Sequence, residues 1–175
     1  GFGRIGRQIF QAGINDPDVK LIFVGSGPEE ENLKNKQKSL DLEKKIFFAG
    51  RRDSLAPFYD IASIFSMPSY YDLESGDIEG LGIVFIEAAL HGVPSLATRS
   101  GGISDAIEDG KTGFLVTERD IAGLREKILF LKKNDSLRKE LGLHAKVFVT
   151  DRFSSEKSIS KHIDVYKKFV GSRND

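Results

Sequence analysis

The feature that most constrains this sequence is a regular alternation between short apolar runs and longer, more polar stretches. The apolar runs are VKLIFVG at 19–25, KIFFAG at 45–50, SIFSMP at 63–68, VPSLAT at 93–98 and GFLV at 113–116. Their length and their β-branched and aromatic residues are typical of buried strands. Strands that alternate with helices are joined by right-handed crossovers, which predicts a parallel sheet covered on both faces. Ligands of such sheets bind at the carboxyl ends of the strands.

The stretches between these runs carry helix signals. Pro28 opens one at 27–42, where acidic residues fill the first turn, and Asp53 is a plausible N-cap for a short helix at 53–62. A third helix is predicted from about Leu81 to His91. A fourth, short helix follows the glycines at 101–102 and is closed by Gly110.

The last third of the chain is predicted to be helical throughout, with one helix from residue 121, a second at 135–149 and a third after Phe153. Apolar residues recur at helical spacing in the first and third of these, and we expect both stripes to be packing surfaces. The stripes are Ile121, Leu124, Ile128 and Leu131, and then Ile159, Ile163, Tyr166 and Val170. We predict one domain over 1–175, with an atypical or grafted segment at 1–16, alternating elements at 17–117 and helices at 118–175.

Composition narrows the partners of this domain. The chain has 175 residues, of which 39% are hydrophobic and 30% are charged, as expected of a soluble protein with one core. Lysine plus arginine equals aspartate plus glutamate at 26, so the net charge is zero, which argues against nucleic acid as a partner. The apolar runs are too short to span a bilayer, and we expect a cytoplasmic protein.

Thiol and metal chemistry are not expected. The chain contains no cysteine, which excludes disulfides, a thiol nucleophile and thiolate metal ligands. His91, His144 and His162 lack the spacing of metal ligands. His91 stands at a predicted helix end before Gly92, where a capping role is more plausible than catalysis.

Two glutamates mark the most informative stretch, GDIEGLGIVFIEAALHGVP at 76–94. Glu79 precedes a helix and lies next to Gly80 and Gly82, which allow the backbone to approach a ligand. The N-terminus of the helix favours phosphate. Glu87 lies among apolar residues, so we expect it to be partly buried and to need a partner. Along a continuous helix the two would be offset by roughly 12 Å, too far for the carboxylate pair of a retaining glycosidase. The spacing suits two anchors on one extended ligand, because each carboxylate can accept two hydroxyl hydrogen bonds.

Other turns at the predicted strand ends are candidates for the same crevice. Gly101 and Gly102 open a helix whose amides could face an anion, although an ordinary tight turn explains them equally well. Gly25 and Gly27 form a similar turn. Gly50 and Arg51 end another strand, where an arginine can meet phosphate or stack on a base.

These residues together resemble the C-terminal domain of a GT-B glycosyltransferase of family 4. The resemblance covers about residues 17–169 and rests on VKLIFVGSGPEEENLK, IFFAGRR and EGLGIVFIEAALHGVPSLATRSGGISDAIEDGKTGFLV, with two glutamates separated by seven residues. It implies a Rossmann-like parallel sheet flanked by helices, the C-terminal half of a GT-B fold with a helical tail. The segment YYDLESGDIEGLGIV is similar to mannosyltransferases that modify phosphatidylinositol.

The resemblance implies a retaining transfer of a hexose, such as mannose, from a nucleotide-diphosphate sugar, with no metal and no other cofactor. Glu79 would be the catalytic-site glutamate that contacts the donor-sugar hydroxyls, and Glu87 would bind the ribose hydroxyls. Gly80, Leu81 and Gly82 would offer backbone to the sugar and the diphosphate. The rim at Gly25, Gly50 and Arg51 would neighbour the base.

Parts of the family pattern have no counterpart in the sequence. The family's first strand and its Gly-Arg and Lys-Gly loop are absent, although Arg4 or Arg7 could substitute for the loop's arginine. The N-terminal acceptor domain is absent too. We therefore expect the isolated domain to be inactive, and we expect membrane contact only through the acceptor or through that domain. A missing first strand would also expose a sheet edge that favours self-association.

The first residues raise an alternative. GFGRIGRQIF resembles the start of a glyceraldehyde-3-phosphate dehydrogenase, and Gly1, Gly3 and Gly6 fit the dinucleotide-binding pattern. That pattern needs a preceding strand and an acidic residue at the end of the second strand, and the dehydrogenase needs a cysteine; the sequence supplies none of these. Two alternatives to the transferase thus stay open: a nucleotide-binding module without catalysis, and an NAD-binding module.

Overall fold

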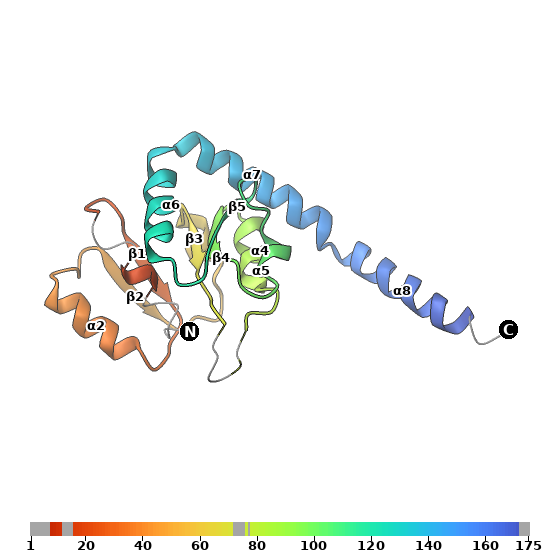
Figure 1. Cartoon of the computed structure of the whole chain (residues 1–175), viewed down its shortest axis with the longest axis horizontal. Coiled ribbons are helices and arrows are strands. Elements are labelled where there is room, and N and C mark those ends of the chain that lie inside the picture. The colour runs from red at the N-terminus through yellow and green to blue at the C-terminus, as the bar shows by residue number, and fades with distance from the viewer. Residues whose placement is uncertain (1–7, 12–15, 72–75, 77, 172–175) are drawn as a thin grey trace.

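The computed structural model describes residues 8–11, 16–71, 76 and 78–171 (Figure 1). A helical turn at 8–11 comes first. The elements that follow are β1 (Leu21–Val24), α2 (Glu30–Ser39), β2 (Ile46–Gly50), α3 (Ala56–Ile61), β3 (Phe65–Met67), α4 (Ile83–Leu90), β4 (Ser95–Thr98), α5 (Ile103–Ala106), β5 (Gly113–Val116), α6 (Ile121–Lys133), α7 (Asp135–Arg152) and α8 (Ser155–Gly171). Each predicted strand is present, and the predicted alternation is confirmed.

The strands pair in parallel, as predicted, but their hydrogen bonds divide them into two sheets. β1 pairs with β2, and β3, β4 and β5 pair in that order. In the doubly wound order 3-2-1-4-5-6, β2 and β1 correspond to positions 3 and 2, and β3, β4 and β5 to positions 4, 5 and 6. No strand of the described residues takes position 1, between β1 and β3.

One hydrophobic core spans both sheets. Its largest cluster contains Ile9, Phe10, Phe23, Leu33, Leu42, Ile46, Leu96, Val116, Leu124 and Ile128. The side chains of β4 alternate between the two faces, so Leu96 joins this cluster while Ala97 joins a second one with Phe85 and Ile103. α6 therefore covers one face of the three-stranded sheet, and α4 and α5 cover the other, as predicted for a parallel sheet.

Three helix starts differ from the prediction. α4 begins at Ile83 instead of Leu81, because Gly82 has a φ of +69° and cannot belong to a right-handed helix. α3 begins at Ala56, and Asp53 does not cap it; Pro57 in its first turn fixes a helical φ there. α2 begins at Glu30, two residues after Pro28.

Two helix ends differ as well. α5 ends at Ala106 rather than at Gly110, which has a φ of +77° in the turn before β5. α7 runs three residues beyond its predicted end, to Arg152.

The N-cap of α6 is Asp120, whose carboxylate accepts a hydrogen bond from the Gly123 N–H at 2.8 Å.

α7 packs tightly on α4. Ala89 of α4 and Ala145 and Val149 of α7 form a buried cluster. Gly142 lies so close to the chain at Gly92 that a Cβ would overlap the Gly92 carbonyl oxygen. The contact fixes the C-terminal end of α4, and with it the position of Glu87.

α8 extends away from the rest of the molecule (Figure 1), and its side chains from 155 to 170 are exposed. Its helical spacing is as predicted, but Ile159, Ile163, Tyr166 and Val170 are exposed, so this stripe is not buried against the described residues, and its prediction as a packing surface stays a prediction. The stripe on α6 is confirmed, with Leu124, Ile128 and Leu131 buried. None of the described helices is long and apolar enough to cross a membrane.

Candidate functional site

Glu79 lies in irregular chain before α4, and its side chain is half-buried. The described part of the chain makes no hydrogen bond or ion pair to its carboxylate. Residues 79–82 are not helical, so the 12 Å offset expected for a continuous helix between Glu79 and Glu87 does not apply. The backbone at Gly82, in the left-handed region, turns this loop into the first turn of α4.

The loop that carries Glu79 is seated on the glycine turn after β4. The Gly102 N–H donates to the Glu79 carbonyl oxygen at 3.3 Å. A Cβ at Gly101 would overlap that oxygen, and a Cβ at Gly102 would lie 2.6 Å from the Gly80 carbonyl oxygen. Close approach of the loop therefore explains both glycines. This hydrogen bond already uses the Gly102 N–H, which was expected to face an anion. A role of Gly101 and Gly102 in donor binding therefore stays a prediction.

The residues between Glu79 and α4 have distinct environments. Gly80 is exposed, with open space where a Cβ would be. The side chain of Leu81 is partly buried against the cluster around Phe85. Gly82 precedes α4 without a side-chain cap, and the first amides of a helix have no acceptor within it.

Glu87 is half-buried and forms a hydrogen bond with a tyrosine, which confirms the predicted partial burial and the need for a partner. The Tyr59 hydroxyl of α3 donates to Glu87 Oε2 at 3.1 Å and lies 3.3 Å from the Val84 carbonyl oxygen. Burial, followed by the hydrogen bond and the charge of Glu87, raises the pKa of Tyr59 well above its usual value. The hydroxyl therefore stays protonated and remains a donor at neutral pH.

A second pair joins the same two helices. His91 Nδ1 and Asp60 Oδ1 are 2.7 Å apart, and the His91 ring lies 5.5 Å from the Tyr59 ring. The His91 N–H also donates to carbonyls of the last turn of α4, which confirms its capping role.

Sequence reasoning did not single out Tyr59 or Asp60. The available signal was indirect: a glutamate in an apolar helix needs a donor, and a tyrosine in another largely apolar helix can supply one.

The other predicted residues meet at the ends of β1 and β2. The Gly25 N–H donates to the Gly50 carbonyl oxygen at 2.8 Å, and both glycines have positive φ. The Gly27 carbonyl accepts from the Glu30 N–H at the start of α2. Arg51 is exposed directly after β2. These four residues form one rim, but no hydrogen bond or ion pair between described residues joins it to Glu79 or Glu87.

Buried polar atoms gather where β3 and β4 end. Gln8 Nε2 donates to the Pro68 carbonyl oxygen at 3.2 Å, and the Thr98 hydroxyl donates to the Ser69 carbonyl oxygen. Gln8 Oε1, Ser69 Oγ and Ser100 Oγ are buried without a hydrogen-bond partner among the described residues. Buried groups of this kind are usually satisfied by water or a ligand, so this end of the sheet can accept polar atoms.

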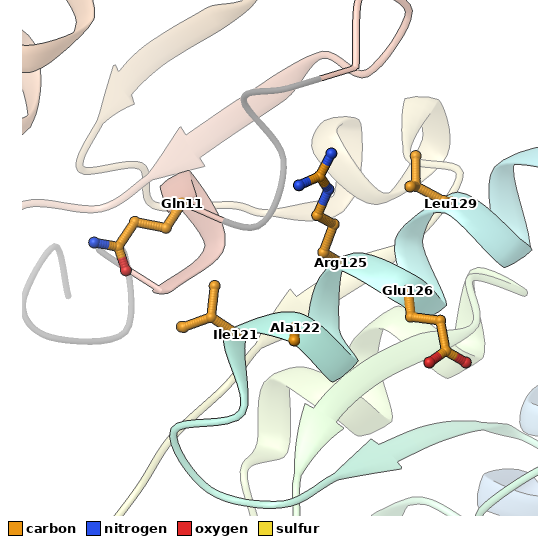
Figure 2. Close-up of a pocket in the computed structure, with 6 residues that line it drawn as sticks. All are labelled: Gln11, Ile121, Ala122, Arg125, Glu126 and Leu129. Atoms are coloured by element: carbon orange, nitrogen blue, oxygen red, sulfur yellow. The ribbon is translucent and has the colours of Figure 1, made fainter.

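A hollow of about 560 Å³ lies elsewhere, between the helical turn at 8–11 and α6 (Figure 2). It is lined by Gln11, Ile121, Ala122, Arg125, Glu126 and Leu129. No predicted site residue lines it, and its surface is mostly apolar. The candidate site is therefore the loop and helix unit of Glu79 and Glu87, and this hollow is separate from it.

Known proteins resemble this chain over most of its length. One relative, N-acetyl-alpha-D-glucosaminyl L-malate synthase of Bacillus anthracis, is 31% identical over 91% of the chain and 40% of its own length. A GDP-mannose-dependent alpha-(1-6)-phosphatidylinositol monomannoside mannosyltransferase of Mycolicibacterium smegmatis is 37% identical over 60% of the chain and 28% of its own length. The chain thus spans about two fifths of the length of the first relative, and a smaller share of the second.

A solved structure shares the fold. It is a mutant of S. aureus TarM in complex with fondaparinux, alpha-GlcNAc-glycerol and UDP, with a TM-score of 0.79 and 25% identity. The match covers 95% of this chain and 33% of the TarM chain. The Rossmann-like architecture of a GT-B C-terminal domain, with a helical C-terminal segment, is thereby confirmed.

The family model of the glycosyl transferases group 1 matches residues 8–148, which contain all the strands described here and both glutamates of the candidate site. The chain belongs to this family of glycosyltransferases.

Proposed function

We propose that residues 1–175 form one donor-binding domain, which holds a nucleotide-diphosphate hexose for retaining transfer to an acceptor. Glu79 contacts the sugar hydroxyls, and Glu87 binds the ribose hydroxyls. Gly80, Leu81 and Gly82 present backbone to the sugar and the diphosphate. The base lies toward Gly25, Gly27, Gly50 and Arg51. Gly101 and Gly102 also belong to the donor site, where they support the Glu79 loop.

The observation that carries this proposal is the anchoring of both glutamates. The Glu79 backbone is fixed on the Gly102 amide, and the Glu87 carboxylate is held at one oxygen by Tyr59. Both leave carboxylate oxygens for which no described residue supplies a donor. Half-buried acceptors fixed in this way are suited to sugar hydroxyls, which are donors of matching geometry.

The proposed reaction needs charge stabilisation more than proton transfer by the protein. The bond between the anomeric carbon and the diphosphate oxygen breaks on the face where the acceptor oxygen bonds to that carbon. The acceptor proton passes to the leaving phosphate oxygen. The uncapped first turn of α4 stabilises the departing negative charge, and no metal is required.

A narrower proposal is that the donor is GDP-mannose and that the protein acts in the cytoplasm. The printed name of the Mycolicibacterium relative, a GDP-mannose-dependent enzyme, supports the donor. The acceptor is expected to bind a second domain, which closes the cleft over the donor. The 175-residue chain alone is therefore expected to bind nucleotide without turning over.

Calorimetric titration of the 175-residue chain with GDP, UDP and NAD, compared with Glu87→Ala, tests the proposal. We expect one nucleoside diphosphate to bind, and the variant to bind it at least tenfold more weakly, a loss of about 1.4 kcal/mol. A control variant, Tyr166→Phe on exposed α8, should bind as the wild type does.

The alternatives predict other outcomes. If NAD alone bound and Glu87→Ala had no effect, the glycines at 1, 3 and 6, which lie outside the described residues, would form the site of an NAD-binding module. If the chain bound a nucleoside diphosphate but neither it nor a longer chain with a second domain transferred sugar, a binding module without catalysis would replace the transferase.

A further inference from the structure

The α3–α4 contact contains a buried hydroxyl whose role is not explained by packing. Tyr59 is 4% exposed, and its ring packs edge-on against Phe65 at 5.6 Å, among Ala88 and Val93. A phenylalanine would fill the same space without the cost of burying a hydroxyl group. The hydrogen-bond partners of the hydroxyl must therefore explain why this position carries a tyrosine.

Its partner is the one carboxylate inside α4. A hydroxyl has a single proton, and the two acceptors within reach are Glu87 Oε2 at 3.1 Å and the Val84 carbonyl at 3.3 Å. The bond to the carboxylate is the shorter of the two and is strengthened by the charge. The Val84 carbonyl already has a place in the helix hydrogen-bond pattern, so Glu87 is the acceptor that depends on Tyr59.

The geometry also selects one oxygen of the carboxylate. Tyr59 holds Oε2, and no described residue donates to Oε1. A free glutamate side chain has three rotatable bonds, and fixing them for a ligand costs conformational entropy. Because Tyr59 is itself immobilised by the core, it fixes this side chain before a ligand arrives.

We propose that Tyr59 is a positioning residue, which orients Glu87 so that Oε1 faces the ribose hydroxyls of the bound nucleotide. The inference rests on the proposed function, since it assumes that Glu87 binds ribose. The neighbouring pair of Asp60 and His91 keeps α3 and α4 in register, because Glu87 and His91 lie one turn apart on the same face.

The test compares wild type, Tyr59→Phe, Glu87→Ala and the double variant, with Tyr166→Phe as the matched control. Each is titrated with GDP or UDP, whichever the wild type binds, and with its 2′,3′-dideoxy form. We expect Tyr59→Phe to weaken binding of the natural nucleotide about three- to tenfold, the net effect of losing one ordinary hydrogen bond. It should leave the dideoxy form unaffected, and add no loss to Glu87→Ala.

A purely structural role for Tyr59 gives a different pattern. The inference is overturned if Tyr59→Phe binds the natural nucleotide as tightly as wild type while Glu87→Ala loses tenfold; the proposed function then survives. It is also overturned if Tyr59→Phe weakens both nucleotide forms equally, which indicates damage to the fold. If Glu87→Ala binds like wild type, or no nucleotide binds, the proposed function fails and the inference fails with it.

Discussion

The side chain of Tyr59 is almost fully buried, and its hydroxyl lies beside the carboxylate of Glu87. Burial disfavours the charged phenolate, and the hydrogen bond and charge of Glu87 disfavour it further, which is why the pKa of Tyr59 is raised. In the unfolded chain the same hydroxyl has an ordinary pKa of about 10. Between these two values the folded protein keeps a proton that the unfolded chain has lost.

Stability should therefore fall as the pH rises above about 10, and this contribution should be fully present below that value. In Tyr59→Phe this loss should be absent, so its free energy of unfolding should decline less steeply, by about 1.4 kcal/mol per pH unit. Urea unfolding of both proteins from neutral pH to above pH 10 measures the difference. Parallel slopes would show that Tyr59 ionises as readily in the folded state as in the unfolded one.

At the scale of elements, the contact between α4 and α7 has little room for change. Gly142 is in mid-helix, where alanine is otherwise favoured by about 1 kcal/mol. Here a Cβ would overlap the Gly92 carbonyl oxygen and lie 2.8 Å from its carbon. Both atoms belong to the backbone, so neither can move aside without shifting the end of α4.

We expect Gly142→Ala to lower the free energy of unfolding by about 1 to 3 kcal/mol, since overpacking outweighs the gain in helix propensity. The neighbouring Leu143→Ala, at a side chain that is 65% exposed, should change it by less than about 0.5 kcal/mol. Chemical denaturation of both variants measures the difference. Equal stabilities would mean that α7 and α4 separate easily.

The elements also show what a sequence can and cannot predict. GFLV at 113–116 was recognisable because a short β-branched and aromatic run between turn residues has few alternatives. The start of α4 was not, since the left-handed backbone of Gly82 depends on a loop that must reach the Gly101–Gly102 turn. The partial burial of Glu87 followed from its apolar neighbours. Its partner did not, because Tyr59 and Glu87 are far apart in the chain and meet only through tertiary packing.

On the scale of the whole molecule, α8 is the element least connected to the rest. Its apolar residues are strongly exposed, from 45% at Ile163 to 71% at Phe169. Apolar burial is the main source of folding stability, so a helix that buries so little contributes little to the fold.

Deleting residues 155–175 should therefore change the free energy of unfolding of the remaining chain by less than about 1 kcal/mol. Removal of the apolar stripe should also reduce self-association, measured by light scattering at matched concentrations. Association that persists after the deletion would point instead to the edges of β1 and β3 that no strand of the described residues pairs. A large loss of stability would show that α8 packs against this chain in solution.

The way in which the Glu79 loop is held has a consequence for how such a domain can diversify. The loop is anchored through main-chain atoms, the Glu79 carbonyl and the Gly102 amide. It can come this close because Gly101 and Gly102 have no side chains. Every residue type carries the same main chain, so natural selection can exchange the exposed side chains of the loop without loosening its attachment. Under the proposed function, in which this loop contacts the donor sugar, relatives can thus evolve preferences for different sugars, provided that the two glycines that support the loop are retained.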